Sequence, residues 1–175
     1  MKTFKKSKND KNKLVISLGD PAGIGTEITL KALGSIELNE KIEPLLVGCK
    51  NNIYQTYKKL ISNGVNNIPD PKSLAIVDLP LEEDFTLGTV DKNTGEASFK
   101  WLSEATNIVL QGKANALVTA PISKLAWHKA NHKFAGQTEL LGKLTNKKTS
   151  MLFTAISPNN GWRFNTLLAT THIPF

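Results

Sequence analysis

The side chains best suited to hold an anionic ligand stand at the start of an expected helix, at Gln137 and Thr138. This helix follows a turn at residues 134–136 and continues to Leu144. Backbone N–H groups in the first turn of a helix have no partner within it, and the helix dipole favours negative charge there. A glutamine and a threonine can add hydrogen bonds to a phosphate or a hydroxyl, or they can simply cap the helix. The residue types alone leave both roles open.

Three histidines offer a second kind of chemistry, metal binding. His128 and His132 have the four-residue spacing that can place two ligands on one helix face. Asn131 is typical of a helix end, however, and no glutamate motif accompanies the pair, so we expect it not to bind a metal. His172 follows an expected buried strand, where side chains point into the ligand crevice of α/β proteins. It is the better metal candidate, although a lone histidine more often has a structural or purely polar role.

A glycine-rich segment, Gly19–Gly25, follows the apolar run Leu14–Leu18 and precedes an expected helix that ends near Gly34. A strand, a glycine turn and a helix start can together bind an anion through backbone N–H groups. The third glycine of the dinucleotide-binding pattern G-x-G-x-x-G is absent. A tight structural turn and a ligand-binding loop therefore remain equally compatible with this segment.

The elements that would position these residues alternate between strands and helices. Besides Leu14–Leu18, apolar runs predict strands at Pro44–Val47, Leu74–Val77, Ala116–Val118, Ser150–Thr154 and Asn165–Ala169. Helical spacing predicts helices over Asn52–Ser62, Gly95–Gln111 and Lys124–Ala130. Ser123 and Asn131 are expected to cap the last of these helices, in which Leu125 is expected to share one face with Ala126 and Ala130. Ile61 and Trp101 are expected to face inward in the other two. Alternation of this kind predicts an α/β fold with a mostly parallel sheet.

The charge of the chain is concentrated at one end. Of a net charge of +7, residues 1–13 carry +5, so we expect a basic, disordered tail at 1–13 rather than a nucleic-acid-binding face. No apolar run approaches the roughly 20 residues that span a bilayer, and no secretory signal is recognisable. The single cysteine, Cys49, cannot form an internal disulfide and is expected to be buried. These features predict a cytoplasmic protein with neither a membrane nor a nucleic-acid partner.

Four sequence segments together resemble one enzyme family. They are GDPAGIGTE at Gly19–Glu27, TAPISK at Thr119–Lys124, F-x-G-x-TELL at Phe134–Leu141 and ATTHIP at Ala169–Pro174. In this order they are similar to the 4-hydroxythreonine-4-phosphate dehydrogenase family of vitamin B6 biosynthesis. The resemblance implies an isocitrate/isopropylmalate dehydrogenase-like three-layer α/β fold, of which residues 14–175 are the N-terminal portion and the C-terminal portion is absent.

The resemblance also implies an activity. Family members oxidise 4-phosphooxy-L-threonine with NAD, and NADP is the alternative cofactor. The product loses carbon dioxide to give 3-amino-2-oxopropyl phosphate for pyridoxine 5'-phosphate biosynthesis. A divalent metal such as Zn, Mg or Co assists, and the full-length proteins are homodimers. The closest rivals are a dehydrogenase of another phosphorylated hydroxy acid, such as a threonate or erythronate phosphate, and an inactive truncated fragment. A phosphate acyltransferase of related fold is a weaker rival, because it would lack the ATTHIP histidine.

Three residues take site roles from this resemblance. Gln137 stands where the family usually has a histidine, and with Thr138 it is expected to contact the phosphorylated substrate. His172 corresponds to the first of three metal-binding histidines. A further departure is Thr26, which replaces a proline of the family motif. Neither the catalytic nor the cofactor-binding residues are assigned by these motifs.

Overall fold

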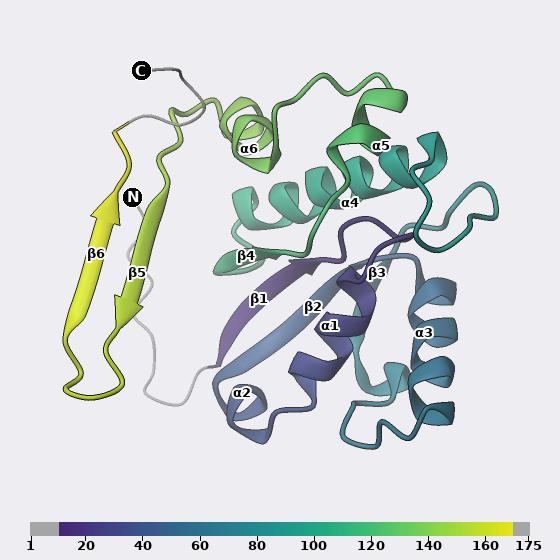
Figure 1. Ribbon diagram of the computed structural model, residues 1–175, viewed down its shortest axis with the longest axis horizontal. Helices are drawn as coiled ribbons and strands as arrows, with labels where there is room; N and C mark the ends of the chain where they lie inside the picture. Colours follow the sequence, from purple (N-terminus) through teal and green to yellow (C-terminus); the bar gives the residue numbers. More distant parts are fainter. Residues whose placement is uncertain (1–10, 170–175) are drawn as a thin grey trace. The chain divides into compact units, whose positions relative to one another are not determined.

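Four parallel strands form the central sheet of this protein. The computed structural model describes residues 11–169, and the chain divides into two compact units, residues 1–135 and 136–175. The sheet belongs to the first unit and has the order β3-β2-β1-β4 (Figure 1). Its strands are β1 (Asn12–Ser17), β2 (Ile42–Gly48), β3 (Ala75–Asp78) and β4 (Ala116–Thr119). The predicted parallel α/β sheet is confirmed.

Helices cover both faces of this sheet. They are α1 (Gly25–Leu33), α2 (Ile36–Lys41), α3 (Lys50–Ser62), a 3₁₀ turn (Pro71–Ser73), α4 (Lys92–Leu110) and α5 (Lys124–Lys129). The chain moves outward from β1 to β2 and β3, and then returns past β1 to β4. Because crossovers between parallel strands are right-handed, this reversal places α4 on the face opposite α1 and α3, which gives three layers (Figure 1).

Two tryptophans anchor the helical layer on the α4 side. Trp101 is 1% exposed, and its Nε1 donates to the Leu79 carbonyl at 3.0 Å, which confirms the predicted inward stripe. Trp127 of α5 is also fully buried and donates to Ser98 Oγ at 2.8 Å. At Gly95, a Cβ atom would lie only 2.1 Å from the Ala126 carbonyl oxygen, so only glycine permits this close approach of α4 to α5.

Some predictions about inward faces were wrong. Ile61 is 40% exposed, although it was expected to face inward. Leu125 is 66% exposed and does not share the buried face of Ala126 and Ala130, as had been expected. In α5 the buried residues are Ala126 and Trp127, because a helix of six residues presents barely one face to its neighbour. Cys49 is buried, as expected.

The cap predictions for α5 are confirmed. The Ser123 side chain accepts a hydrogen bond from Ala126 N at 3.2 Å, and Asn131 adopts the left-handed conformation with φ 64°. Other boundaries differ slightly from the predicted ones. Strand β1 begins at Asn12, before the predicted boundary of the tail, and α4 begins at Lys92 because Asp91 caps it. Within residues 11–169, every helix is too short or too polar to cross a membrane.

The second unit contains a helix and a hairpin. Helix α6 spans Gln137–Thr145, and strands β5 (Leu152–Ile156) and β6 (Arg163–Leu167) pair antiparallel. Both strands were predicted, with slightly different bounds, but they form a separate two-stranded sheet and do not join the parallel sheet. The two strands pair antiparallel because parallel neighbours need a crossover of about a dozen residues, which residues 157–162 cannot provide.

Candidate functional site

The order of the sheet creates a topological switch point between β1 and β4. From β1 the chain proceeds to β2 on one side, whereas β4 lies on the other side. In parallel α/β sheets, ligands bind in the crevice beyond the carboxyl ends of the strands at such a point. Residues 18–24 follow β1 and residues 120–123 follow β4, and the two segments meet at this edge.

These two segments are held together at Gly19 and Pro121. Gly19 has φ +71°, and a Cβ atom there would lie 2.1 Å from the Pro121 carbonyl oxygen. The same oxygen accepts a hydrogen bond from Asp20 N at 2.9 Å. Position 19 therefore requires glycine for both its backbone conformation and its close contact. This close contact and the hydrogen bond join the two segments at the switch point.

Asp20 places a buried carboxyl group at this edge. The residue is 7% exposed, and its Oδ1 accepts a hydrogen bond from Ala22 N at 2.9 Å. Burial raises the pKa of Asp20 above 3.8, opposed by hydrogen bonds from Ala22 N–H and the Thr94 side chain, while the charge of Asp91 raises it further. A buried carboxyl with a shifted pKa in a ligand crevice is a candidate functional group. The sequence motifs did not mark Asp20 as a site residue, although its position directly after a buried strand was a usable signal.

The start of α1 is fixed by a close backbone contact and a polar pair. A Cβ atom on Gly25 would lie 2.0 Å from the Leu18 carbonyl oxygen, so this glycine serves packing. Asn52 Nδ2 donates to Thr26 Oγ1 at 3.3 Å, and both residues are buried. Thr26, the departure from the family motif, thus has a specific partner on α3. The glycine segment combines a structural turn with a position at the ligand crevice.

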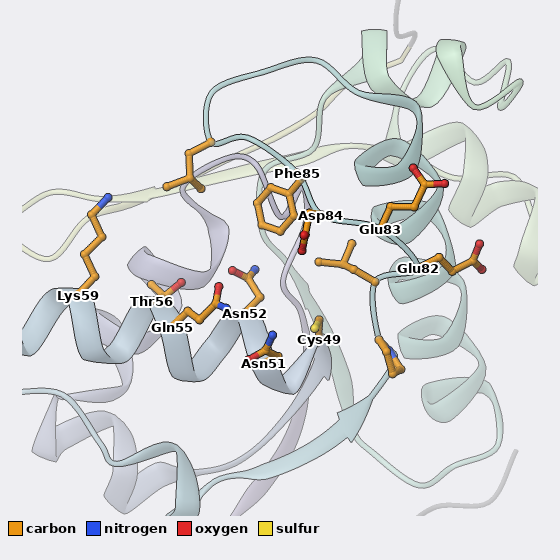
Figure 2. Close-up of a pocket in the computed structure, with 13 residues that line it drawn as sticks. Cys49, Asn51, Asn52, Gln55, Thr56, Lys59, Glu82, Glu83, Asp84 and Phe85 are labelled. Carbon is orange, nitrogen blue, oxygen red and sulfur yellow. The ribbon is translucent and has the colours of Figure 1, made fainter.

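A pocket of about 810 Å³, lined by both polar and apolar residues, opens beside the carboxyl ends of β2 and β3. Figure 2 shows amide and hydroxyl side chains of α3, including Asn52 and Thr56, along one side, with Asp84 and Phe85 in the segment across from them. Amides and Lys59 supply donors, and carboxylates supply acceptors. The pocket therefore suits a polar ligand that carries both hydrogen-bond donors and acceptors.

Gln137 and Thr138 occupy the first two positions of α6, so the predicted helix start is confirmed. Both are half-buried, and the Thr138 carbonyl accepts a hydrogen bond from Thr149 Oγ1 at 3.4 Å. The N-cap residue, Gly136, has no side chain to cap the helix. In the described part of the chain, the buried Glu139 Oε2 has no hydrogen-bond partner. The helix start thus offers backbone donors beside one carboxylate oxygen that can accept a further hydrogen bond.

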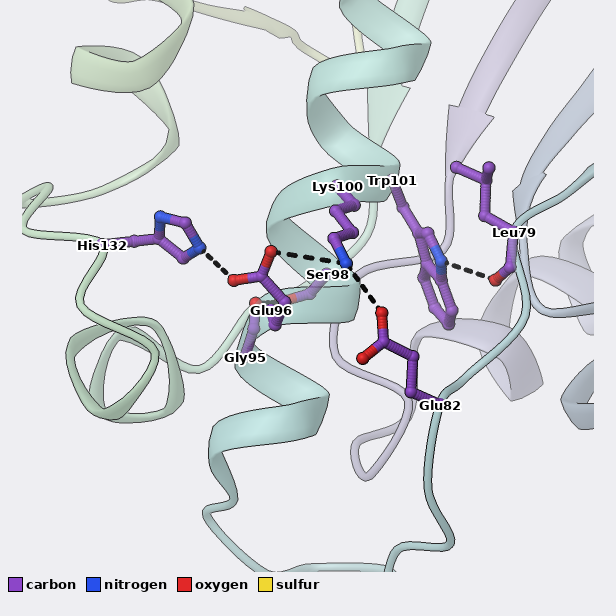
Figure 3. Close-up of polar contacts among 8 residues, drawn as sticks. All are labelled: Leu79, Glu82, Gly95, Glu96, Ser98, Lys100, Trp101 and His132. Atoms are coloured by element: carbon purple, nitrogen blue, oxygen red, sulfur yellow. Dashed lines mark hydrogen bonds and ion pairs between the residues drawn. The ribbon is translucent and has the colours of Figure 1, made fainter.

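His132 has a structural environment rather than that of a metal ligand. Its ring stacks on Phe99 with centroids 3.6 Å apart, and its Nε2 lies 2.6 Å from Glu96 Oε2 (Figure 3). Because α5 ends at Lys129, His128 and His132 do not share a helix. Residues 11–169 contain no group of three or more His, Cys, Asp or Glu side chains able to hold a metal ion. His172, the predicted metal ligand, lies outside the described residues.

Comparison with known proteins identifies related sequences and folds. The sequence model of the family described as "Pyridoxal phosphate biosynthetic protein PdxA" matches residues 33–175. The 4-hydroxythreonine-4-phosphate dehydrogenase of Synechococcus sp. (strain RCC307) is 52% identical over 93% of this chain and 49% of its own length. The D-threonate 4-phosphate dehydrogenase of Pectobacterium atrosepticum is 35% identical over 77% of this chain and 44% of its own.

A solved structure shares the fold. The 4-hydroxythreonine-4-phosphate dehydrogenase of Burkholderia phymatum superposes with a TM-score of 0.79 at 24% identity, covering 95% of this chain and 52% of that one. The chain thus spans about half the length of the curated relatives it matches.

Proposed function

The chain belongs to the PdxA family of pyridoxal phosphate biosynthetic proteins, and from this premise we propose that it forms the N-terminal half of a 4-hydroxythreonine-4-phosphate dehydrogenase. The complete enzyme would oxidise 4-phosphooxy-L-threonine with NAD or NADP and release carbon dioxide, giving 3-amino-2-oxopropyl phosphate. It would act as a cytoplasmic homodimer. The observation that carries the proposal is the 52% identity to the Synechococcus enzyme over nearly the whole chain.

In this proposal the start of α6 holds the phosphate of the substrate. The Gln137 amide and the Thr138 hydroxyl would donate hydrogen bonds, and the backbone N–H groups of the first turn would add theirs. Glutamine supplies a neutral donor, whereas the histidine usual in the family could also carry charge or a proton. Gln137 would therefore bind and orient the substrate without exchanging a proton with it.

The metal proposed for the complete enzyme needs ligands beyond residues 11–169. A divalent metal would polarise the substrate oxygens as a Lewis acid. The described residues provide no ligand cluster, so they do not form a metal site by themselves. Only His172 of this chain is proposed as a ligand, and catalytic metal sites use about three protein ligands. The segment Gly19–Gly25 likewise lacks the complete glycine pattern G-x-G-x-x-G that binds dinucleotides such as NAD.

A second candidate function is the oxidation of a threonate phosphate, because the Pectobacterium enzyme is 35% identical. Both possibilities can be tested in a chimera that joins residues 1–175 to the remaining part of the Synechococcus enzyme. The assay supplies NAD, a divalent metal and either 4-phosphooxy-L-threonine or D-threonate 4-phosphate, and follows NADH absorbance. A higher kcat/KM for 4-phosphooxy-L-threonine is expected. Preference for the threonate would favour the second candidate, and turnover of neither would refute both.

A further inference from the structure

The pocket beside the carboxyl ends of β2 and β3 contains polar side chains that the fold does not use. Asn51, Gln55 and Lys59 recur every four residues on α3, so they lie on one stripe of this helix along the pocket (Figure 2). Asp84 lies in the segment across from them. In the described part of the chain, the side chains of these four residues take part in no hydrogen bond or ion pair. The pocket therefore offers one cation, one anion and two amides to a ligand.

An aromatic ring and aliphatic side chains complete the lining. Phe85 and Leu81 are half-buried beside the pocket. Among residues 11–169, no other aromatic ring packs against Phe85. The face of such a ring stacks on a second planar π system. The volume of about 810 Å³ lies within the range of about 300–1,000 Å³ usual for small-molecule sites. The pocket consequently suits a ligand that combines a planar ring with polar and charged groups.

We propose that this pocket binds an adenine nucleotide such as AMP. The base would stack on Phe85, and the Gln55 or Asn51 amide would pair with it. An amide offers a donor beside an acceptor, which matches N6 and N7 of adenine, whereas O6 and N7 of guanine both require donors. The Asp84 carboxylate can accept hydrogen bonds from ribose hydroxyls, and the Lys59 ammonium attracts a phosphate.

The location of the pocket separates it from the ligand crevice of the proposed dehydrogenase. In the sheet order β3-β2-β1-β4, the pocket lies beside β2 and β3, whereas the switch point lies between β1 and β4. A nicotinamide must reach the substrate to accept its hydride. The nucleotide of this pocket is therefore a second ligand, distinct from the cofactor that is reduced. The proposal does not depend on the dehydrogenase activity.

Titration calorimetry can test the proposal in the chimera that joins residues 1–175 to the remaining part of the Synechococcus enzyme. NAD is supplied at a saturating concentration, so that the cofactor site is filled before AMP is added. One AMP per chain is expected to bind. Phe85→Ala should weaken this binding at least about fivefold, because the base loses its stacking partner. Lys59→Ala should remove the advantage of AMP over adenosine. The matched control is Lys58→Ala, an exposed lysine of α3 outside the pocket, which should change neither affinity.

Several results would overturn the proposal. They are no binding of AMP when NAD is saturating, affinity that Phe85→Ala and Lys59→Ala leave unchanged, and an equal loss in Lys58→Ala. Equal affinity for GMP would overturn the assignment of adenine. Circular dichroism checks folding, and if Phe85→Ala does not fold, Lys59→Ala decides. If the chimera does not fold, the 175-residue chain takes its place, because it contains every residue of the pocket. An inactive chimera that binds AMP would refute the dehydrogenase proposal and support this one.

Discussion

Strand β1 and the hairpin β5–β6 have comparable apolar sequences but opposite surroundings. In β1, Val15 is completely buried and Ile16 is 7% exposed. In the hairpin, Phe153 and Phe164 are 56% and 49% exposed, and every residue of β5 is exposed. Local hydrophobicity therefore made both segments strands but did not decide whether they were buried.

The connections explain the difference between these two regions. β1 is followed by a crossover that carries α1, and the later return to β4 carries α4, so its neighbours arrive with helices that cover the sheet. The hairpin is closed by a short turn and brings no covering element of its own. A parallel sheet thus acquires its cover from its own connections, whereas a hairpin depends on cover from elsewhere.

The largest expected effect concerns activity. The 175-residue chain alone should produce no NADH from 4-phosphooxy-L-threonine, NAD and a divalent metal, because residues 11–169 contain no metal-binding cluster and His172 cannot hold the metal alone. The exposed hairpin side chains should also make the chain bind a hydrophobic dye strongly or aggregate. Turnover by the chain, verified as intact by mass, would contradict the first expectation.

The two tryptophans Trp101 and Trp162 make a matched pair for stability. Trp101→Ala should lower the free energy of unfolding by about 3–5 kcal/mol, because Trp101 is 1% exposed and its removal leaves a cavity. Trp162→Ala should change it by no more than about 0.5 kcal/mol, since Trp162 is 61% exposed. Urea unfolding followed by circular dichroism measures both. Similar losses would mean that the hairpin is as well packed as the sheet.

His172 follows the hairpin in the sequence, and its proposed role as a metal ligand can be tested directly. In the chimera, His172→Ala should weaken the affinity for a divalent metal at least about tenfold, as expected for the loss of a ligand. Titration calorimetry measures the change, and His128→Ala is the control because His128 lies on α5, distant in sequence from the ATTHIP motif. If both variants bind metal as the parent does, the assignment of His172 is wrong.

A smaller effect on the free energy of unfolding is expected at Asp20, which follows the buried strand β1. Asp20→Ala should cost about 0.5–1.5 kcal/mol, because Ala22 N–H loses its acceptor. Asp20→Asn keeps an acceptor and removes a buried charge. Since the folded pKa is raised above 3.8, the wild-type chain should lose stability relative to Asp20→Asn as pH rises through that folded pKa. Urea unfolding across this range tests the sign, with the exposed Asp84→Asn as control.

The smallest effect concerns Gln137. In the chimera, Gln137→Ala should raise KM for the phosphorylated substrate. The rise should correspond to the loss of one hydrogen bond, which contributes about 0.5–1.5 kcal/mol to the binding free energy. Gln137→His should be tolerated, because histidine is the usual family residue there. Steady-state kinetics separates KM from kcat. An alanine variant with unaltered kinetics would leave Gln137 with only a helix-start role.

The sequence alone determined most local structure. Apolar runs predicted each strand of residues 11–169 within a few residues, whether the strand is buried or exposed, and Ser123 and Asn131 marked the ends of α5 through their capping preferences. The motifs also indicated the family that the comparisons confirm. These are properties of short segments, and residues near one another in the chain suffice to specify them.

Only the tertiary structure decided which groups meet and which remain uncovered. The contact between Gly19 and Pro121 joins residues about a hundred positions apart, and the hydrogen bond from Asp20 N to the Pro121 carbonyl does the same. The same holds for the separation of β5–β6 from the parallel sheet and for the exposed face of β4. Such features depend on strand order and crossover direction, which local periodicity does not encode, because equal apolar runs can be buried in one place and exposed in another.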